Sequence, residues 1–389
     1  MNKMKYKIPL FKTYWNDDDI EAVNNVIRRG NHWAVGPELE EFEQKIMEYV
    51  GTKYALSFNS GTSALHLALL ACNIKDKEVI VPSFTFAATV NAVVLAGGIP
   101  VFAESEGNTF GLDADDVQKK ITGKTKAIVN LHYAGFASKE TLKLRKIANN
   151  HNLILVDDAA ESFGAMIDGK KVGCFADVSI LSFCQNKIIS TGEGGAIVTD
   201  SEEIYEKVKL LRSHGRSEAT GNYFTSTKDN DYIDVGYNLR MSSMTAALGI
   251  SQLSKIDQII SMRREKAHFL DEGLSKINEI EVLTEPEGFF SVYQMYTIKL
   301  PDELTRNALQ EHLTKNGIMT KIYFNPIHLK TAYQRMYSTR VGNLVKTEEL
   351  SKRVLTLPMY PGLSEEELNY LISTIKSFFI NGEQYGTNI

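Results

Sequence analysis

Short β-branched segments alternate with helical segments between residues 50 and 200, and this alternation restricts the possible folds more than any other feature. Strands are predicted at Val79–Val81, Ile99–Phe102, Ala127–Leu131, Leu153–Val156, Val178–Phe183 and Ala196–Thr199. Helices are predicted at Ser60–Cys72, Thr85–Ala96, Asp113–Ile121 and Lys139–Asn149. The pattern predicts βαβ units and a mostly parallel sheet with helices on both faces. Ligands of such sheets bind beyond the carboxyl ends of the strands, which is where we look for a site.

The length of 389 residues predicts a large domain and a smaller one. A helix predicted over Met241–Ile260 would lead from one to the other, so we expect a large domain at 1–255 and a small α+β domain at 256–389. The N-terminal segment is a candidate to pack on the small domain. In the C-terminal part, strands are predicted at Val282–Leu283, Tyr293–Leu300 and Met319–Tyr323, and helices at Leu304–Asn316 and Glu365–Phe379. The polar segment Gly215–Asp231 lacks periodicity and predicts a long loop.

The composition argues against several classes of partner. The net charge is −5 and the basic residues are scattered, so no nucleic-acid partner is expected. The N-terminal stretch has no apolar segment typical of a signal peptide, and no segment reads as a membrane span. Cys72, Cys174 and Cys184 are far apart, so neither a disulfide framework nor a metal site is expected. We therefore expect a cytoplasmic protein.

Residues Gly164–Lys171 match the phosphate-binding P-loop pattern except at the last position. Lys171 stands where the pattern requires the Ser or Thr that contacts magnesium. Asp168-Gly169 lies between apolar flanks, a sequence typical of a tight hairpin turn. We therefore predict a hairpin, and no glycine-rich dinucleotide fingerprint follows any predicted strand.

Residues Asn59–Ser63 (NSGTS) lie between an apolar run and an alanine- and leucine-rich helix. Backbone N–H groups at a helix N-terminus bind phosphate well, and the hydroxyls and the glycine suit such a site. The same residues also occur as ordinary helix caps. Both interpretations stay open on this motif alone.

Two carboxylates, Asp157 and Asp158, end the predicted strand Leu153–Val156. A carboxylate at the end of a buried strand is costly unless it has a partner. The partner could be a protonated pyridine nitrogen, a magnesium ion or a helix N-terminus, and simple capping of the next helix is an equally good explanation.

Lys187 lies between a predicted strand and a glycine-rich turn, Gly192–Gly195, about thirty residues after the acidic strand end. A lysine near a cationic cofactor loses its proton more readily and can form an imine with an aldehyde. A lysine alone would mean little. The order of phosphate loop, strand-end aspartate and then lysine before a glycine-rich turn is what indicates this chemistry.

These motifs resemble those of the DegT/DnrJ/EryC1/StrS aminotransferases, and the resemblance covers nearly the whole chain. Outside the lysine and aspartate segments it includes Ile8-Pro9, Trp33–Glu38, Phe42-Glu43, Asn59–Thr62, Ala64–Ala68, Pro82–Phe86, Gly236–Arg240, Asn325–His328 and Leu357-Pro358. The resemblance implies the type I, aspartate aminotransferase-like α/β fold, with a large, mostly parallel sheet domain and a smaller C-terminal domain. It also implies the cofactor pyridoxal 5'-phosphate (PLP).

The resemblance assigns the residues nearest the reaction. Lys187 corresponds to the family's Schiff-base lysine, and Asp158 to the aspartate that pairs with the pyridine nitrogen. The glutamate usual before that aspartate is Asp157 here, which departs from the family pattern. Glu161 lies where the family has His, Gln or Glu near the phenolic oxygen of the cofactor, and Phe86 where an aromatic ring lies against the pyridine.

Further assignments by resemblance concern the phosphate and the substrate. The positions that correspond to phosphate contacts are Gly61, Thr62 and Ser182. Asn238 corresponds to an asparagine that reaches the phosphate from the neighbouring subunit, which implies a homodimer with shared sites. His328 lies in a segment near the substrate site, and Arg240 is a candidate to bind the donor carboxylates. Cys184 matches no catalytic position, and we interpret it as a packing residue.

The implied reaction moves an amino group, from L-glutamate, to a nucleotide-linked 3- or 4-keto-deoxysugar. Lys187 would hold PLP and then move the proton between the donor's α-carbon and the cofactor. Related 3-dehydratases have histidine in place of this lysine, so Lys187 argues against that activity. A smaller phosphorylated ketone remains an alternative substrate. A PLP-binding regulator without turnover is less expected, because the first helix is predicted near Asp17 and leaves no room for an appended DNA-binding module.

Overall fold

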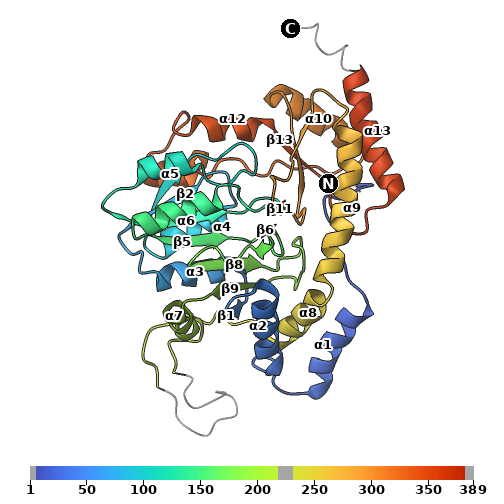
Figure 1. Ribbon diagram of the computed structural model, residues 1–389. Helices are drawn as coiled ribbons and strands as arrows, with labels where there is room; N and C mark the ends of the chain where they lie inside the picture. Colours follow the sequence, from blue (N-terminus) through green and yellow to red (C-terminus); the bar gives the residue numbers. More distant parts are fainter. Residues whose placement is uncertain (1–5, 218–230, 382–389) are drawn as a thin grey trace.

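The computed structural model describes residues 6–217 and 231–381 and is built around a seven-stranded sheet (Figure 1). The strands are β1 (Tyr54–Phe58), β2 (Glu78–Pro82), β3 (Ile99–Ala103), β4 (Thr125–Leu131), β5 (Ile154–Asp158), β8 (Val178–Ser182) and β9 (Gly195–Thr199). Their order is β1-β9-β8-β5-β4-β2-β3. Only β9 runs against its neighbours, since β1 and β8 both pair with it antiparallel and the other pairs are parallel. The predicted mostly parallel sheet is confirmed.

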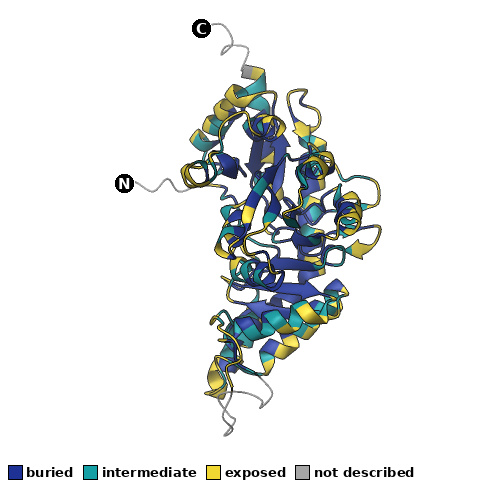
Figure 2. Ribbon diagram, turned by 90° about the vertical axis from the view of Figure 1, so that its left-hand side faces the viewer, coloured by how far each residue is buried: buried dark blue, intermediate teal, exposed yellow. Residues whose placement is uncertain are grey.

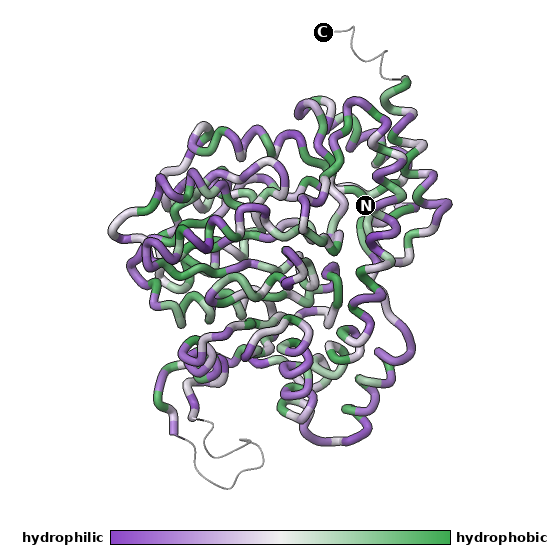
Figure 3. Tube along the Cα trace, viewed as in Figure 1, coloured by the Kyte–Doolittle hydropathy of each residue, from purple (hydrophilic) through white to green (hydrophobic). Residues whose placement is uncertain are grey.

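Alternate residues of the strands face opposite layers of helices, as the two-residue period of a strand requires. Val79 and Val81 of β2 pack with α3 (Gly61–Ala71), α4 (Ala87–Leu95) and α7 (Glu202–Arg212). Ile80, between them, packs on the other face with α5 (Ala114–Lys120) and α6 (Thr141–Asn150). Figure 2 shows the strands buried between helices whose outer faces are exposed, and Figure 3 shows hydrophobic residues concentrated along the central strands.

A second, smaller unit of helices and strands lies beside this sheet. Its three-stranded antiparallel sheet has the order β10 (Glu281–Val282), β12 (Tyr296–Lys299) and β13 (Val354–Leu357). Figure 1 shows α9 (Ile256–Leu274), α10 (Glu303–Lys315) and α13 (Glu365–Asn381) around it. The remaining helices of this part are the short 3-10 helix η1 (Ile327–Leu329), α11 (Thr331–Tyr337) and α12 (Val345–Arg353).

The N-terminal segment packs on this C-terminal part. The backbone N–H groups of Lys7 and Ile8 donate to the Gly317 carbonyl, and Ile8 forms a parallel bridge with Ile318. The segment continues into α1 (Asp17–Arg29) and α2 (Pro37–Val50), which pack against α8 (Ser243–Leu253).

The single helix predicted over Met241–Ile260 is wrong, because α8 ends at Leu253 and α9 begins at Ile256. Between them, Lys255 makes a buried ion pair with Asp19 of α1 at 2.7 Å (Nζ to Oδ1). This ion pair with α1 fixes the chain at the break between α8 and α9. A division of the chain into domains at 255 remains a prediction.

The strand predicted at Met319–Tyr323 is also absent. Met319 N donates to the Ile8 carbonyl, whereas Lys321 exchanges two backbone hydrogen bonds with Thr356 of β13. The partners of this segment therefore lie on two different chain segments, and no continuous ladder forms. Of the loop predicted at Gly215–Asp231, residues 218–230 lie outside the described part of the chain.

The hairpin predicted in place of a P-loop is confirmed. Strands β6 (Met166–Ile167) and β7 (Lys170–Lys171) pair antiparallel, and β11 (Phe289–Phe290) extends the small sheet. Asp168 and Gly169 both have positive φ, 49° and 75°, as a two-residue turn of this hand requires. None of the described helices is long and apolar enough to span a membrane.

Candidate active site

The carboxyl ends of β1, β2, β4, β5 and β8 meet at one edge of the sheet, where they border a cavity of about 430 Å³. Seven of the residues predicted to contact the cofactor line this cavity. They are Gly61, Thr62, Phe86, Asp158, Glu161, Ser182 and Lys187. They are spread over 127 positions of the sequence, from Gly61 to Lys187, and the parallel strands bring them together because each strand ends at the same edge.

One wall of the cavity is the N-terminus of α3. Ser60 caps the helix, since its hydroxyl accepts a hydrogen bond from Ser63 N at 3.1 Å. The amides of Gly61 and Thr62 belong to the first turn, so no carbonyl within the helix can accept from them. A side chain on Gly195 of β9 would place its Cβ 2.5 Å from Gly61 N, so a glycine there lets β9 pass directly beside this helix start. The arrangement suits a phosphate, which binds to free amides at the positive end of a helix.

Asp158 lies in the cavity wall at the end of β5, with only 5% of its surface exposed. Its Oδ2 accepts from the Thr89 hydroxyl at 2.6 Å and its Oδ1 from Ala160 N at 3.2 Å. Burial raises the pKa of Asp158, and the hydrogen bonds from Thr89 and Ala160 partly oppose that rise. Because both donors are neutral, a cation beside this carboxylate would stabilise its charged form.

Asp157 points to the opposite side of the strand. It is fully buried, its Oδ1 accepts from the Asn130 amide at 3.1 Å, and its Oδ2 lies 3.2 Å from His132 Nε2. The His132 Nδ1 accepts from Ser138 N, so the proton of a neutral ring is on Nε2, although Nε2 and Asp157 Oδ2 do not have hydrogen-bond geometry. Asp157 therefore has protein partners of its own and does not line the cavity.

The Lys187 amine lies inside the cavity, with its Nζ 3.4 Å from Glu161 Oε1. The other oxygen of Glu161 accepts from Ala134 N at 3.0 Å, which fixes the carboxylate. Two contacts from distant segments hold the loop before the lysine. Thr13 Oγ1 donates to the Gln185 carbonyl at 2.8 Å, and the Gln294 amide donates to the Asn186 carbonyl.

Three predicted residues lie elsewhere. Asn238 is exposed and does not line the cavity of its own chain. Arg240 lines a separate hollow with Arg212 and Arg216. His328 is fully buried, with Nδ1 2.6 Å from Ser83 Oγ and Nε2 3.1 Å from Glu348 Oε1, so both ring nitrogens have protein partners away from the cavity.

Several residues of the cavity were not predicted from the sequence. Thr89 is one, although a threonine in an otherwise apolar helix start is a signal that could have been followed. The others come from segments far from the motifs and form a mainly aromatic wall. They are Phe11, Lys321, Tyr323 and Phe324. Cys184 also lines the cavity, and its sulfur lies 3.7 Å from Glu193 Oε1.

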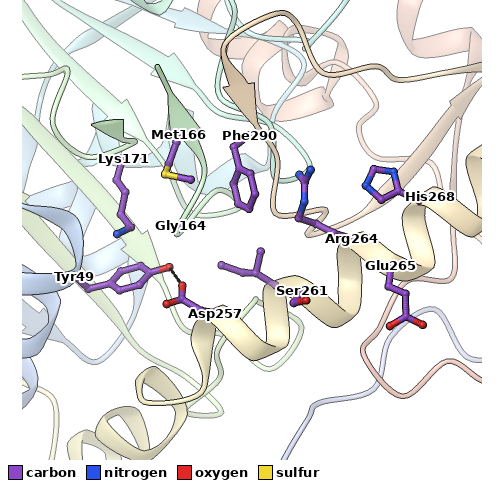
Figure 4. A pocket seen from close by; sticks show the side chains of 11 residues that line it. Tyr49, Gly164, Met166, Lys171, Asp257, Ser261, Arg264, Glu265, His268 and Phe290 are labelled. Carbon is purple, nitrogen blue, oxygen red and sulfur yellow. Dashed lines mark hydrogen bonds between the residues drawn. The ribbon is translucent and has the colours of Figure 1, made fainter. Parts of the chain in front are cut away.

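A second hollow, of about 540 Å³, lies between α9 and the small β6-β7-β11 sheet (Figure 4). Several of its polar groups contact other protein groups: Tyr49 donates to Asp257 at 2.9 Å, and the Lys171 Nζ lies 4.0 Å from the centre of the Tyr49 ring. Arg264 forms an ion pair with Glu285. None of the predicted cofactor-binding residues lines this hollow, so we place the chemistry of the molecule at the first cavity, with Lys187. Within the described ranges, no group of His, Cys, Asp and Glu residues could hold a metal ion.

The residues of the first cavity fit PLP in three respects. The α3 N-terminus offers amides for a phosphate, Asp158 offers a buried carboxylate for a protonated ring nitrogen, and Lys187 offers an amine for an aldehyde. Asp158 is the most specific of these three groups, because it is buried, accepts hydrogen bonds from two neutral donors and would be stabilised in its charged form by a neighbouring cation.

Comparison with known proteins agrees with this geometry. The model of the DegT/DnrJ/EryC1/StrS aminotransferase family matches residues 14–376. A GDP-perosamine synthase of Vibrio cholerae is 34% identical over 375 residues, which cover 96% of this chain and 99% of that protein. A UDP-4-amino-4,6-dideoxy-N-acetyl-beta-L-altrosamine transaminase of Campylobacter jejuni is 32% identical over 366 residues, 93% of this chain and 95% of that protein.

Solved structures of similar proteins share the fold. Helicobacter pylori PseC, an aminotransferase involved in the biosynthesis of pseudoaminic acid, superposes with a TM-score of 0.89 at 30% identity, covering 96% of this chain and 99% of that one. A Streptococcus pneumoniae protein solved in its PLP form has a TM-score of 0.89 at 26% identity and covers 96% and 98% of the two chains. The fold is therefore the predicted type I fold, and the chain belongs to the DegT/DnrJ/EryC1/StrS family of PLP-dependent aminotransferases.

Proposed function

We propose that this aminotransferase transfers the amino group of L-glutamate to a nucleotide-linked 3- or 4-keto-deoxysugar. The observation that carries the proposal is a single cavity that joins the three groups suited to PLP with a wall of Phe11, Tyr323 and Phe324. Aromatic rings provide flat, apolar contact surfaces for a sugar or a base. The relatives named above, whose names refer to GDP- and UDP-linked amino sugars, support a nucleotide-sugar substrate.

Each residue has a definite part in this proposal. Lys187 would hold the cofactor through its amine and, once released, would move a proton as base and then as acid. Asp158 would keep a proton on the pyridine nitrogen, and the amides of Gly61 and Thr62 would bind the phosphate. When bound, PLP supplies the aldehyde and the ring that accepts the electrons of the α-carbon. Glutamate leaves as 2-oxoglutarate, and the keto-sugar leaves as an amino-sugar.

The test is a reaction of the purified holoenzyme with L-glutamate and either a GDP- or a UDP-linked 4-keto-6-deoxysugar. We expect equal amounts of 2-oxoglutarate and amino-sugar nucleotide, measured by mass spectrometry. A parallel reaction uses a small phosphorylated ketone as acceptor. Amination of that ketone, with none of the sugar nucleotides, would contradict the proposed substrate class.

Thr89 offers a test of the Asp158 assignment. Thr89→Val removes a hydrogen bond to a charged group, so we expect kcat to fall about ten- to a hundredfold. The Thr89 hydroxyl stabilises the charged carboxylate, so its loss raises the pKa of Asp158 further. As the pH is lowered, the variant should therefore lose activity at a higher pH than the wild type does. Thr89→Ser keeps the hydroxyl and serves as the control. A profile that shifts equally in both variants would contradict a role for this hydrogen bond.

We further propose a homodimer in which Asn238 serves the site of the partner subunit. Asn238 is exposed and does not line the cavity of its own chain, and exposed apolar residues precede it, with Ile233 at 63% and Val235 at 88% of full exposure. Exposed apolar patches often mark protein interfaces.

Mixing two inactive variants tests this arrangement. Asn238→Asp should be nearly inactive, because a carboxylate would repel the cofactor phosphate. When it is unfolded and refolded with an equal amount of Lys187→Ala, about half of the dimers should be mixed, and each mixed dimer has one intact site. We expect about a quarter of wild-type activity. Absence of recovery in a sample shown to contain mixed dimers would contradict site sharing.

A further inference from the structure

The cavity has few positive charges for an enzyme that we propose to act on anions. Among the described residues that line it, the cationic side chains are Lys187 and Lys321, and the acidic ones are Asp158, Glu161 and Glu193. Glutamate carries two carboxylates, and a nucleotide-linked sugar carries a diphosphate. Two of the three acids also lie close to the reacting amine, so an anion that approaches Lys187 meets repulsion unless a cation compensates it.

Lys187 would not provide that compensation, because in the proposed function its amine would be bound to the cofactor. Lys321 is then the one cation that the described lining of a single subunit keeps for a substrate. No carboxylate of the described residues forms an ion pair with it, and its ammonium lies over the Tyr323 ring, 4.5 Å from the ring centre. Its charge is therefore not neutralised by a protein acid.

The placement of Lys321 combines a fixed backbone with a side chain whose ammonium contacts the Tyr323 ring and forms no ion pair with a carboxylate of the described residues. Lys321 N donates to the Thr356 carbonyl at 3.1 Å, and Thr356 N donates to the Lys321 carbonyl at 2.8 Å, so β13 anchors the residue. The residue itself is exposed, which places its ammonium at the mouth of the cavity. A lysine in this position keeps its hydration until a ligand arrives and can swing to meet it.

We propose that Lys321 is a specificity-determining residue that binds an anionic group of the substrate, either a carboxylate of the amino donor or a phosphate of the nucleotide-sugar. The inference rests on the proposed function, since it concerns the same cavity. A carboxylate and a phosphate both present negatively charged oxygen atoms, and the lysine ammonium acts on either of them as a compact positive charge.

The experiment compares Lys321→Gln with Lys321→Arg and with Lys276→Gln, a matched control at an exposed lysine outside this cavity. Binding of 2-oxoglutarate and, separately, of guanosine and uridine diphosphates to each holoenzyme is measured by calorimetry. We expect Lys321→Gln to weaken one of the two ligand classes about three- to tenfold, whereas Lys321→Arg and Lys276→Gln bind within about twofold of wild type. The class that weakens identifies which anion Lys321 contacts.

The dependence on salt gives a second readout. The affected Kd should rise with ionic strength in the wild type and much less in Lys321→Gln, because the ion pair is exposed to solvent. Unchanged binding of both classes in Lys321→Gln, or an equal loss in Lys276→Gln, would overturn the inference. A failure of the proposed function would give a different result from a failure of this inference. No keto-sugar nucleotide would be aminated, while 2-oxoglutarate binding could still depend on Lys321.

Discussion

Lys187→Ala should lower the rate of amino transfer by about four orders of magnitude, because it removes both the covalent attachment and the group that moves the proton. The visible absorption of the bound cofactor should change at the same time, since the bond to the lysine cannot form. The measurement is the glutamate half-reaction, followed by absorbance in single-turnover conditions. The variant should stay folded, because the Lys187 side chain borders the cavity and its hydrogen-bond partner is the Glu161 side chain.

Cys184→Ala is a matched control in the same loop. Cys184 lines the same cavity and lies three positions before the lysine, but no step of the proposed reaction uses its sulfur. We expect it to retain activity within about threefold, with a melting temperature close to that of the wild type. Wild-type turnover in Lys187→Ala would show that another residue attaches the cofactor.

Asp158→Asn should lower kcat by about a hundred- to a thousandfold, because an amide cannot pair with a protonated ring nitrogen. Asp157→Asn is the comparison, since the two carboxylates are neighbours and point to opposite sides of β5. For Asp157→Asn we expect a loss of about 1–3 kcal/mol in the free energy of unfolding instead, because the change alters a fully buried carboxylate that accepts a hydrogen bond from the Asn130 amide. The measurements are kcat and thermal denaturation of both variants, which separate a loss of activity from a loss of stability. A larger kinetic loss in Asp157→Asn would overturn the assignment of Asp158.

Residues that follow one another at the ends of parallel strands could be predicted from the sequence. Asp158 and Lys187 belong to motifs with a fixed order, and the strand ends carry them to one edge of the sheet. Lys321 and Tyr323 could not be predicted in the same way. The backbone of their segment pairs at Met319 with the N-terminal segment and at Lys321 with β13, and such pairings between distant segments leave no periodic pattern in a sequence.

His328 shows a different limit of sequence reasoning. The motif around it resembles a segment near the substrate site of the family, but the structure surrounds both ring nitrogens with Ser83 and Glu348. A motif identifies a residue type at a position, whereas the hydrogen bonds available to a side chain depend on what packs around it. The break between α8 and α9 has the same origin, since the contact of Lys255 with Asp19 joins residues 236 positions apart.

The two contacts that hold the lysine loop have a consequence for how the protein matures during synthesis. The Gln294 amide donates to the Asn186 carbonyl across 108 residues of sequence. When the strands of the large sheet have just been synthesised, Gln294 has therefore not yet been added to the chain. The nascent chain can complete its strands and the contact of Thr13 with the Gln185 carbonyl well before the contact of Gln294 with the loop can form. The loop that carries Lys187 should therefore reach its final placement late, and chains that end before Gln294 should lack one of its two contacts even where their sheet is complete.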